Sequence, residues 1–197
     1  MNLVLPVLIG YFIGSIPFGY LIVQRLKKQD IRKLGSGNTG VTNVLRIAGT
    51  APALVVLIGD MGKGILAVMI GKWFGTELIG MFAGLASIAG HNWSVFLKFS
   101  GGRGVATGAG VFAALAPKVL LITALIWVGT IALTRYVSLG SILGAASVPI
   151  LMLIFQKSAL LIVFSFLAAF FVIYRHRPNI RRLLEGTEYR FGEKPHQ

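Results

Sequence analysis

The sequence predicts an all-α integral membrane protein with about seven transmembrane helices, on the basis of its composition, its apolar runs and its charge distribution. Of its 197 residues, 55% are hydrophobic and only 13% are charged, and the mean hydropathy is +0.80. A soluble domain of this size could not bury so many apolar side chains, so lipid is the expected solvent. With no cysteine in the chain, neither a disulfide framework nor a thiolate metal site is expected.

Seven apolar runs supply the predicted spans. The first covers residues 3–23, about 21 residues without a charge, which suffices to cross roughly 30 Å of hydrocarbon. Gly10 and Gly14 within this run form a small-xxx-small pair that favours close helix packing. The other runs cover residues 52–71, 78–97, 105–116, 119–133, 137–155 and 158–174. Because the run at 105–116 is short for a crossing, the turn before it is expected to dip into the bilayer.

The basic residues set the predicted orientation. No basic residue precedes the first run and three closely follow it, the reverse of a signal peptide, so this run is expected to remain as an anchor. With seven spans, fifteen of the 19 basic residues fall on one side, at Arg135 and in the polar segments 24–50, 98–104 and 175–197. The positive-inside rule therefore places these segments and the C-terminus in the cytoplasm and the N-terminus outside. No internal repeat of the kind found in many transporters is visible.

Basic residues outnumber acidic ones by 19 to 6, which favours an anionic partner. Because the hydropathy excludes nucleic acid, that partner is expected to be an anionic substrate or membrane surface. The segment 34–49 carries hydroxyls and amides among glycines and leads into a short helix ending at Arg46. Its polar side chains suit a polar ligand, and Arg46 suits a phosphate or carboxylate. The segment's candidate ligand-binding residues are Ser36, Asn38, Thr42 and Asn43. The alternative is a turn with helix caps, which the same residue types form.

Asp60 and Lys63 interrupt the second apolar run. At a spacing of i and i+3 they lie on one helical face, where their attraction lowers the cost of placing charge inside a membrane. Since a charge there costs about 2.5–3.5 kcal/mol, a functional role is favoured. The alternative is a buried ion pair that bridges helices or holds a loop.

A glycine-rich basic turn, residues 100–107, lies between two apolar runs. Bare glycines expose backbone N–H groups, and Arg103 adds a planar fork of donors suited to phosphate, so an oxyanion is the expected ligand. Gly101, Gly102 and Gly104 are the candidate backbone donors. The alternative is that these glycines end or pack transmembrane helices. His91, near the end of the preceding run, is expected to be a hydrogen-bonded residue and not a base.

The predicted topology gathers four polar clusters on the inner membrane face. They are the Ser36 loop with Arg46, the 101–104 turn, Ser141, and the tail that begins with His176 and Asn179. Together they predict one inner-leaflet site for a strongly anionic ligand, open sideways to an acyl chain from the lipid.

Three motifs, in this order, resemble those of the bacterial acyl-phosphate-dependent glycerol-3-phosphate acyltransferases. They are Gly35 to Arg46, Gly90-His91 through Thr107, and His176 to Glu188. The resemblance covers nearly the whole chain, residues 14–188. This chain has Arg103 where the family usually has lysine, which preserves the charge but changes its geometry. It also departs from the family around Asn92-Trp93-Ser94.

The resemblance implies a single transmembrane acyltransferase domain over residues 1–197 that moves a fatty acyl group from acyl phosphate to glycerol 3-phosphate. The products would be lysophosphatidic acid and inorganic phosphate, in the first acylation of phospholipid biosynthesis. Residues and resemblance together assign catalytic roles to Ser36, Arg46, Ser141, His176 and Asn179. Substrate and phosphate binding is assigned to Asn38, Thr42, Asn43, Lys63, Gly101, Gly102, Arg103 and Gly104. Asp60 and Glu188 are assigned structural roles.

The set of candidate catalytic residues predicts a substrate-assisted reaction. An acyl phosphate is a mixed anhydride with a good leaving group, so the protein must chiefly hold two mutually repelling anions together. Because the second pKa of a phosphate monoester is about 6, the donor's phosphate could accept the proton of the attacking hydroxyl. No convincing Ser-His-Asp set or carboxylate pair competes for that role.

The expected setting is the bacterial inner membrane, with the site facing the cytoplasm. A monomer without cofactor, metal or nucleic acid is expected, coupled to the enzyme that makes acyl phosphate. Thioester-dependent acyltransferases commonly carry His-x-x-x-x-Asp, but Phe96 follows His91 and Arg181 follows His176 at that spacing. The alternative function is transport of anionic solutes along a path lined by Asp60 and Lys63.

Overall fold

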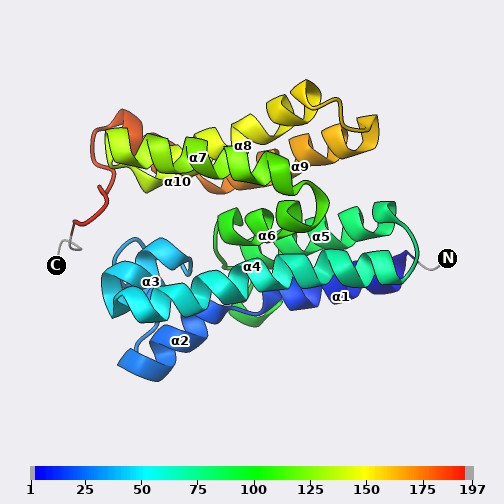
Figure 1. Ribbon diagram of the computed structural model, residues 1–197. Helices are drawn as coiled ribbons and strands as arrows, with labels where there is room; N and C mark the ends of the chain where they lie inside the picture. Colours follow the sequence, from blue (N-terminus) through cyan, green and yellow to red (C-terminus); the bar gives the residue numbers. More distant parts are fainter. Residues whose placement is uncertain (1–2, 194–197) are drawn as a thin grey trace.

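The computed structural model describes residues 3–193, all of whose regular elements are helices (Figure 1). The first half contains α1 (Val4–Ser15), α2 (Phe18–Lys27), α3 (Val41–Ala48), α4 (Thr50–Trp73) and α5 (Glu77–Asn92). The second half contains α6 (Val105–Leu115), α7 (Pro117–Thr134), α8 (Val137–Ile154), α9 (Ala159–Arg175) and α10 (Arg177–Leu184). Two 3-10 turns, η1 (Ile31–Lys33) and η2 (Val95–Leu97), lie in the longer connections.

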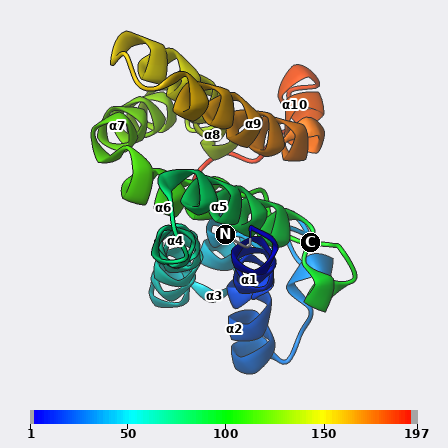
Figure 2. The ribbon, with the colours of Figure 1, turned by 90° about the vertical axis from the view of Figure 1, so that its right-hand side faces the viewer.

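The helices form two layers. α7, α8 and α9 make one layer, and α1, α4, α5 and α6 make the other, with α5 and α6 on the side that faces the first layer (Figures 1 and 2). Small residues bring the helices of the second layer close together: a Cβ on Gly14 of α1 would collide with the backbone of Ser87 in α5. A Cβ on Gly110 of α6 would likewise collide with the backbone of Met61 in α4. The packing role expected for Gly14 is therefore confirmed.

The prediction of seven spans is wrong for the part of the chain that the structure describes. Four segments have the length and hydropathy to cross a membrane: Val4–Lys27, α4, α7 and α8. α9 and α10, bent by 58° at their junction, make a fifth if counted as one span. α5 and α6 have 16 and 11 residues, fewer than the roughly 20 that a crossing needs. The physical reason is the irregular segment 93–104, which contains η2 and most of the glycine-rich turn and separates the end of α5 at Asn92 from the start of α6 at Val105.

The first span also differs in detail from the expected run over residues 3–23. It is broken at Ile16–Pro17 and then continues as α2 to Lys27. Proline has no backbone N–H and clashes with the preceding turn, which accounts for the break. The break leaves the carbonyl of Ile16 free to accept a hydrogen bond from outside its own helix.

One apolar cluster joins the two layers at one end of the molecule, and we call it the deep cluster. Its buried members come from α4 to α9 and from the α6–α7 turn: Val68, Met81, Ile88, Val111, Phe112, Ala116, Val119, Val148, Met152, Leu161, Phe164 and Ala168. At the opposite end lie α3 in one layer, α10 beside the other, and the polar segment 187–193 (Figure 1). The layers are thus sealed at one end and leave room between them towards the other.

Candidate active site

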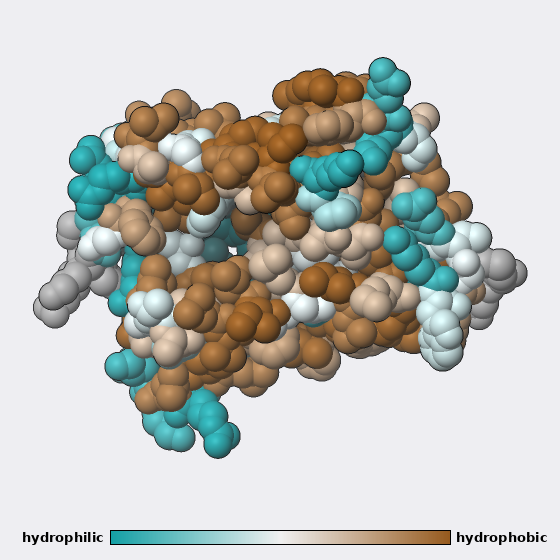
Figure 3. All heavy atoms as spheres, in the orientation of Figure 1, coloured by the Kyte–Doolittle hydropathy of each residue, from teal (hydrophilic) through white to brown (hydrophobic). Residues whose placement is uncertain are grey.

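A cavity of about 540 Å³ lies between the two layers. Its walls come from α3 to α10 and from residues 188–191 of the tail. The surface is hollowed between α7 and α4, and hydrophilic atoms are visible inside the hollow (Figure 3). Polar and basic residues line the cavity near α3 and α10, whereas the rest of its lining is mostly apolar.

Most residues that the sequence singled out lie on this one cavity. They are Ser36, Asn38, Thr42, Asn43, Arg46, Asp60, Arg103, Gly104, Ser141, His176, Asn179 and Glu188. Lys63, Gly101 and Gly102 do not line it. Segments separated by up to 152 positions, from Ser36 to Glu188, therefore face one cavity.

Arg103 presents a positive charge to the cavity without a direct ion-pair partner in the described residues 3–193. Its guanidinium donates no hydrogen bond to any residue within the described range 3–193. Burial lowers the pKa of Arg103 to about 10, an effect that Glu188 opposes and that the neighbouring Arg182, Arg175 and Arg46 reinforce. Even so, Arg103 remains charged at neutral pH. A bound anion would relieve both the desolvation and the mutual repulsion of these arginines.

Arg46 provides a second cation in the cavity lining. It lies in α3, half buried, with its guanidinium carbon 5.1 Å from the centre of the Tyr189 ring. Burial lowers the pKa of Arg46, although Glu188 and other neighbours oppose this effect. The aromatic ring holds the guanidinium plane while leaving its N–H groups available to a ligand.

Asn43 shapes the loop that carries Ser36 and Asn38. Its amide nitrogen donates to the carbonyls of Leu34, at 3.0 Å, and Asn38, at 2.9 Å. Its amide oxygen accepts the backbone N–H of Ser36 at 3.1 Å. Asn43 is 1% exposed, and both ends of its amide are occupied, so the geometry supports positioning of the loop in place of the predicted substrate contact.

The glycine-rich turn is held from two sides. The N–H of Gly102 donates to the carbonyl of His91 at 2.9 Å, so this N–H is not available for the predicted anion contact. Arg175 donates to the carbonyls of Gly102, at 3.1 Å, and Gly101, at 2.9 Å. Gly104, with φ at +81°, then turns the chain into α6. The sequence reasoning missed Arg175, although it directly precedes His176, where the third motif begins.

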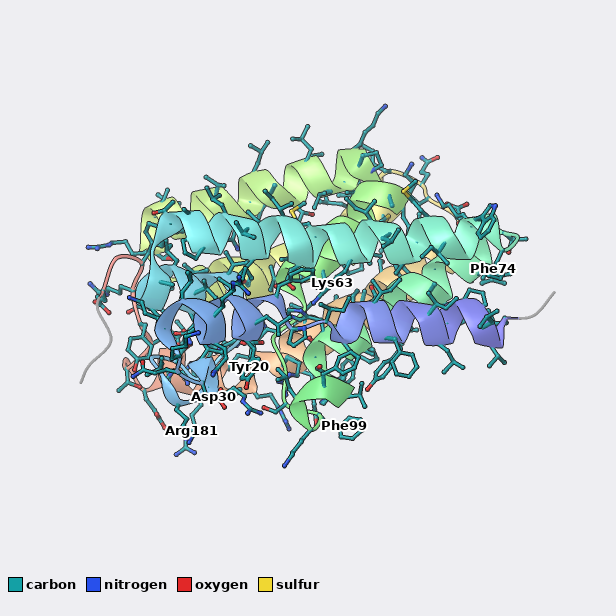
Figure 4. The ribbon with its side chains drawn as sticks, turned by 90° about the horizontal axis from the view of Figure 1, so that it is seen from below. Tyr20, Asp30, Lys63, Phe74, Phe99 and Arg181 are labelled. Carbon is teal, nitrogen blue, oxygen red and sulfur yellow. The ribbon has the colours of Figure 1, made fainter. Side chains whose placement is uncertain are left out.

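Lys63 differs from its predicted role as a phosphate ligand. Its ammonium lies 2.7 Å from Asp60 Oδ1 and donates to His91 Nδ1, at 2.8 Å, and to the carbonyl of Ile16, at 3.1 Å. Figure 4 shows Lys63 between α4 and the break between α1 and α2. Lys63 and Asp60 are buried, and protein groups already engage the ammonium. This is the buried ion pair that the sequence left as the alternative.

Asn179 and Glu188 form a polar pair at the cavity's basic end. The amide nitrogen of Asn179 donates to Glu188 Oε1 at 2.6 Å, while Glu188 Oε2 accepts from Arg182 Nε at 2.7 Å. The buried amide oxygen of Asn179 accepts no hydrogen bond from residues 3–193. Glu188 thus fixes the direction of the amide and leaves Asn179 with an acceptor for a ligand hydroxyl.

Ser141 and His176 complete the lining between α8 and α10. The Ser141 hydroxyl donates to the Val137 carbonyl at 2.9 Å and accepts from the Trp127 ring N–H at 3.2 Å. His176, 1% exposed, lies 2.7 Å from the Val172 carbonyl through Nδ1, which therefore carries the proton. Its Nε2 is then an acceptor.

The environment of His176 makes the protein sensitive to acid. Burial, reinforced by the charge of Arg103, lowers the pKa of His176 from 6.5 to about 4. Between these values the unfolded chain binds a proton that the folded protein does not, so stability falls as the pH falls through this window. We expect a loss of about 3 kcal/mol in the free energy of unfolding. Unfolding of His176→Asn, whose amide can replace the Nδ1 donor, should depend less on pH, and an equal dependence would contradict this assignment.

Comparison with known proteins agrees with this geometry. A family model described as glycerol-3-phosphate acyltransferase matches residues 4–186. The chain is 48% identical to a glycerol-3-phosphate acyltransferase of Desulforamulus reducens, with 95% of each chain covered. It is 50% identical to glycerol-3-phosphate acyltransferase 2 of Moorella thermoacetica, covering 96% of this chain and 98% of that one.

Two crystal structures of the integral membrane glycerol 3-phosphate acyltransferase PlsY (YgiH) share the fold. Its glycerol 3-phosphate form has a TM-score of 0.91 and 40% identity, with 96% of each chain covered. Its lysophosphatidic acid form has a TM-score of 0.88 and 38% identity, covering 96% of this chain and 95% of that one. Sequence and fold agree over nearly the whole length, and the chain therefore belongs to the glycerol-3-phosphate acyltransferase family.

Proposed function

We propose that this protein transfers a fatty acyl group from acyl phosphate to glycerol 3-phosphate, forming 1-acyl-glycerol 3-phosphate and inorganic phosphate. The observation that carries the proposal is a single cavity with arginines at one end and an apolar lining along the rest. Such a cavity suits a molecule that joins a phosphate to a fatty chain. The similar PlsY structures hold glycerol 3-phosphate and lysophosphatidic acid, the acceptor and the product of this reaction.

The basic end of the cavity would hold two phosphates at once. Arg103 and Arg46 come from different helical segments and both face the cavity, so each can neutralise part of the charge. Without them, two phosphates at a few ångströms would repel each other strongly in a partly buried site. The carboxamide oxygen of Asn179 and Nε2 of His176 would accept hydrogen bonds from the hydroxyls of glycerol 3-phosphate.

The chemical step needs no carboxylate base. A hydroxyl oxygen of glycerol 3-phosphate forms a bond to the acyl carbon, the bond from that carbon to the phosphate oxygen breaks, and the proton passes to the departing phosphate. Glu188 is engaged by Asn179 and Arg182, and Asp60 is engaged by Lys63, so neither carboxylate is free to take that proton. A His176→Ala enzyme that binds both substrates normally yet has no turnover would argue for a histidine base instead.

We further propose that the site faces the cytoplasm of a bacterium from its inner membrane, with the N-terminus outside. Basic residues in α3, α9 and α10 lie near Arg103 at the polar end of the cavity, in keeping with the positive-inside rule. The similar proteins are bacterial. We propose a monomer that takes its donor from the enzyme producing acyl phosphate.

The test is a donor and acceptor assay on the purified full chain. We expect phosphate release from palmitoyl phosphate only when glycerol 3-phosphate is present, with one lysophosphatidic acid formed per phosphate. Palmitoyl thioesters should give no product. Phosphate release without acceptor, or faster transfer from a thioester, would overturn the proposal. Movement of glycerol 3-phosphate across vesicles without acylation would favour the transport alternative.

A further inference from the structure

The apolar end of the cavity is closed by one residue from each of four helices. The lining residue farthest from the polar end is Phe112 on α6, Leu120 on α7, Val148 on α8 and Ala168 on α9. Residues beyond this level do not line the cavity. The four side chains therefore form a floor, which lies opposite the arginines and histidine of the polar end.

The floor rests on the deep cluster. Phe112, Val148 and Ala168 all belong to that cluster, whose further members Met152, Leu161 and Phe164 fill the space behind them. The Phe112 ring packs edge-on against Phe164, with ring centres 5.7 Å apart and planes at 63°. Interiors packed in this way resist the insertion of extra methylene groups. A chain that enters from the polar end is stopped here.

Above the floor, a glycine on α6 leaves the passage through the cavity unobstructed. Gly108 lies one helical turn before Phe112 and lines the cavity. A Cβ built on Gly108 would find only the Cδ1 atom of Ile88 within 4 Å, at 3.9 Å. From Gly104, beside Arg103, to Phe112 the helix rises by about 12 Å, with Gly108 halfway. A longer side chain at residue 108 would therefore project into the passage and shorten it.

We propose that α6 selects the length of the acyl chain, with Gly108 keeping the passage open and Phe112 ending it. This inference rests on the proposed function, because it assumes that the donor's acyl chain occupies the apolar end. In an apolar pocket of fixed depth, one methylene too many or too few changes kcat/KM by about 10- to 200-fold. The donor whose chain reaches the floor is thus preferred over both shorter and longer donors.

The experiment compares lauroyl, myristoyl, palmitoyl and stearoyl phosphates as donors for the full-length enzyme. Gly108→Leu should move the optimum to shorter chains and lower kcat/KM for the wild-type optimum at least ~10-fold relative to lauroyl phosphate. Phe112→Ala should move the optimum to longer chains. The matched control is Gly62→Leu, the same change in α4 at an exposed position outside the cavity, with no atom within 4 Å of the added Cβ. It should keep the wild-type profile.

The outcomes separate this inference from the proposed function. If Gly108→Leu and Phe112→Ala change kcat/KM by the same factor for every chain length, the length selection is overturned while acyl transfer stands. If the wild-type enzyme uses none of the acyl phosphates, the proposed function itself fails. Should Phe112→Ala not fold, Phe112→Leu provides a smaller change at the same position, and its optimum should also lengthen. An unchanged profile in Phe112→Leu and Gly108→Leu would overturn the inference.

Discussion

Replacing Arg103 by alanine is expected to lower kcat/KM for glycerol 3-phosphate by at least ~100-fold, since it removes a bidentate pair of charge-assisted hydrogen bonds worth about 1.5–3 kcal/mol each. The guanidinium faces the cavity without a hydrogen-bond partner among residues 3–193. Arg103→Lys should retain most activity because the charge stays, with a loss of about 10-fold from the missing bidentate geometry. Steady-state kinetics with both substrates varied would measure these effects.

The stability of the Arg103 variants provides a second, independent readout. Because burial lowers the pKa of Arg103 to about 10, the charged group opposes folding when no anion is bound. Arg103→Ala should therefore unfold at the same temperature as wild type or higher, yet gain less from added inorganic phosphate. Arg181→Ala, which removes a largely exposed arginine paired with Glu185, is the matched control and should behave as wild type. Full activity in Arg103→Ala, or an equal loss in Arg181→Ala, would contradict the assignment.

Asp60→Ala is expected to destabilise the folded protein by about 3–5 kcal/mol, because it leaves a buried ammonium without its counter-charge. Lys63 would keep its contacts with His91 and the Ile16 carbonyl but lose the carboxylate at 2.7 Å. The measurement is thermal unfolding of the purified protein in detergent, followed by helical circular dichroism. The variant should unfold well below wild type at the same pH.

A double variant tests whether the pair acts as a unit. Asp60→Leu combined with Lys63→Met removes both charges and fills similar volume, so it should recover most of the stability that Asp60→Ala loses. If instead the double variant is destabilised by the sum of the losses in the single variants Asp60→Leu and Lys63→Met, the two residues act independently. The ion-pair interpretation would then be wrong.

Local patterns were sufficient for the membrane class and for the residue types of the site. Hydropathy is a property of consecutive residues, so the runs at 52–71, 119–133, 137–155 and 158–174 could be recognised before any packing was known. The same reasoning failed at residues 78–116, where it counted two crossings. The apolar run at 78–97 continues past Asn92, where α5 ends, since hydropathy does not register that the glycine-rich turn folds back on the carbonyl of His91.

The sequence reasoning was weakest in predicting which hydrogen-bond or ion-pair partner each polar group has in the folded protein. Asn43, Lys63 and Gly102 are polar groups suited to an anion, and nothing local distinguishes them from Arg103. In the structure the first three are engaged by Ser36, Asp60 and His91, whereas Arg103 has no such partner in residues 3–193. Arg175 was missed for the same reason, because its two acceptors lie 73 and 74 residues away.

By itself, the sequence determined that this chain is a membrane protein, that it carries an excess of positive charge, and which motifs could bind a phosphate. Only the tertiary structure decided which cations remain available, how deep the apolar end of the cavity reaches, and where Phe112 closes it. The division has a physical cause. Solvent preference and helix formation depend on neighbouring residues, but a hydrogen bond or a cavity wall depends on atoms that only packing brings within a few ångströms.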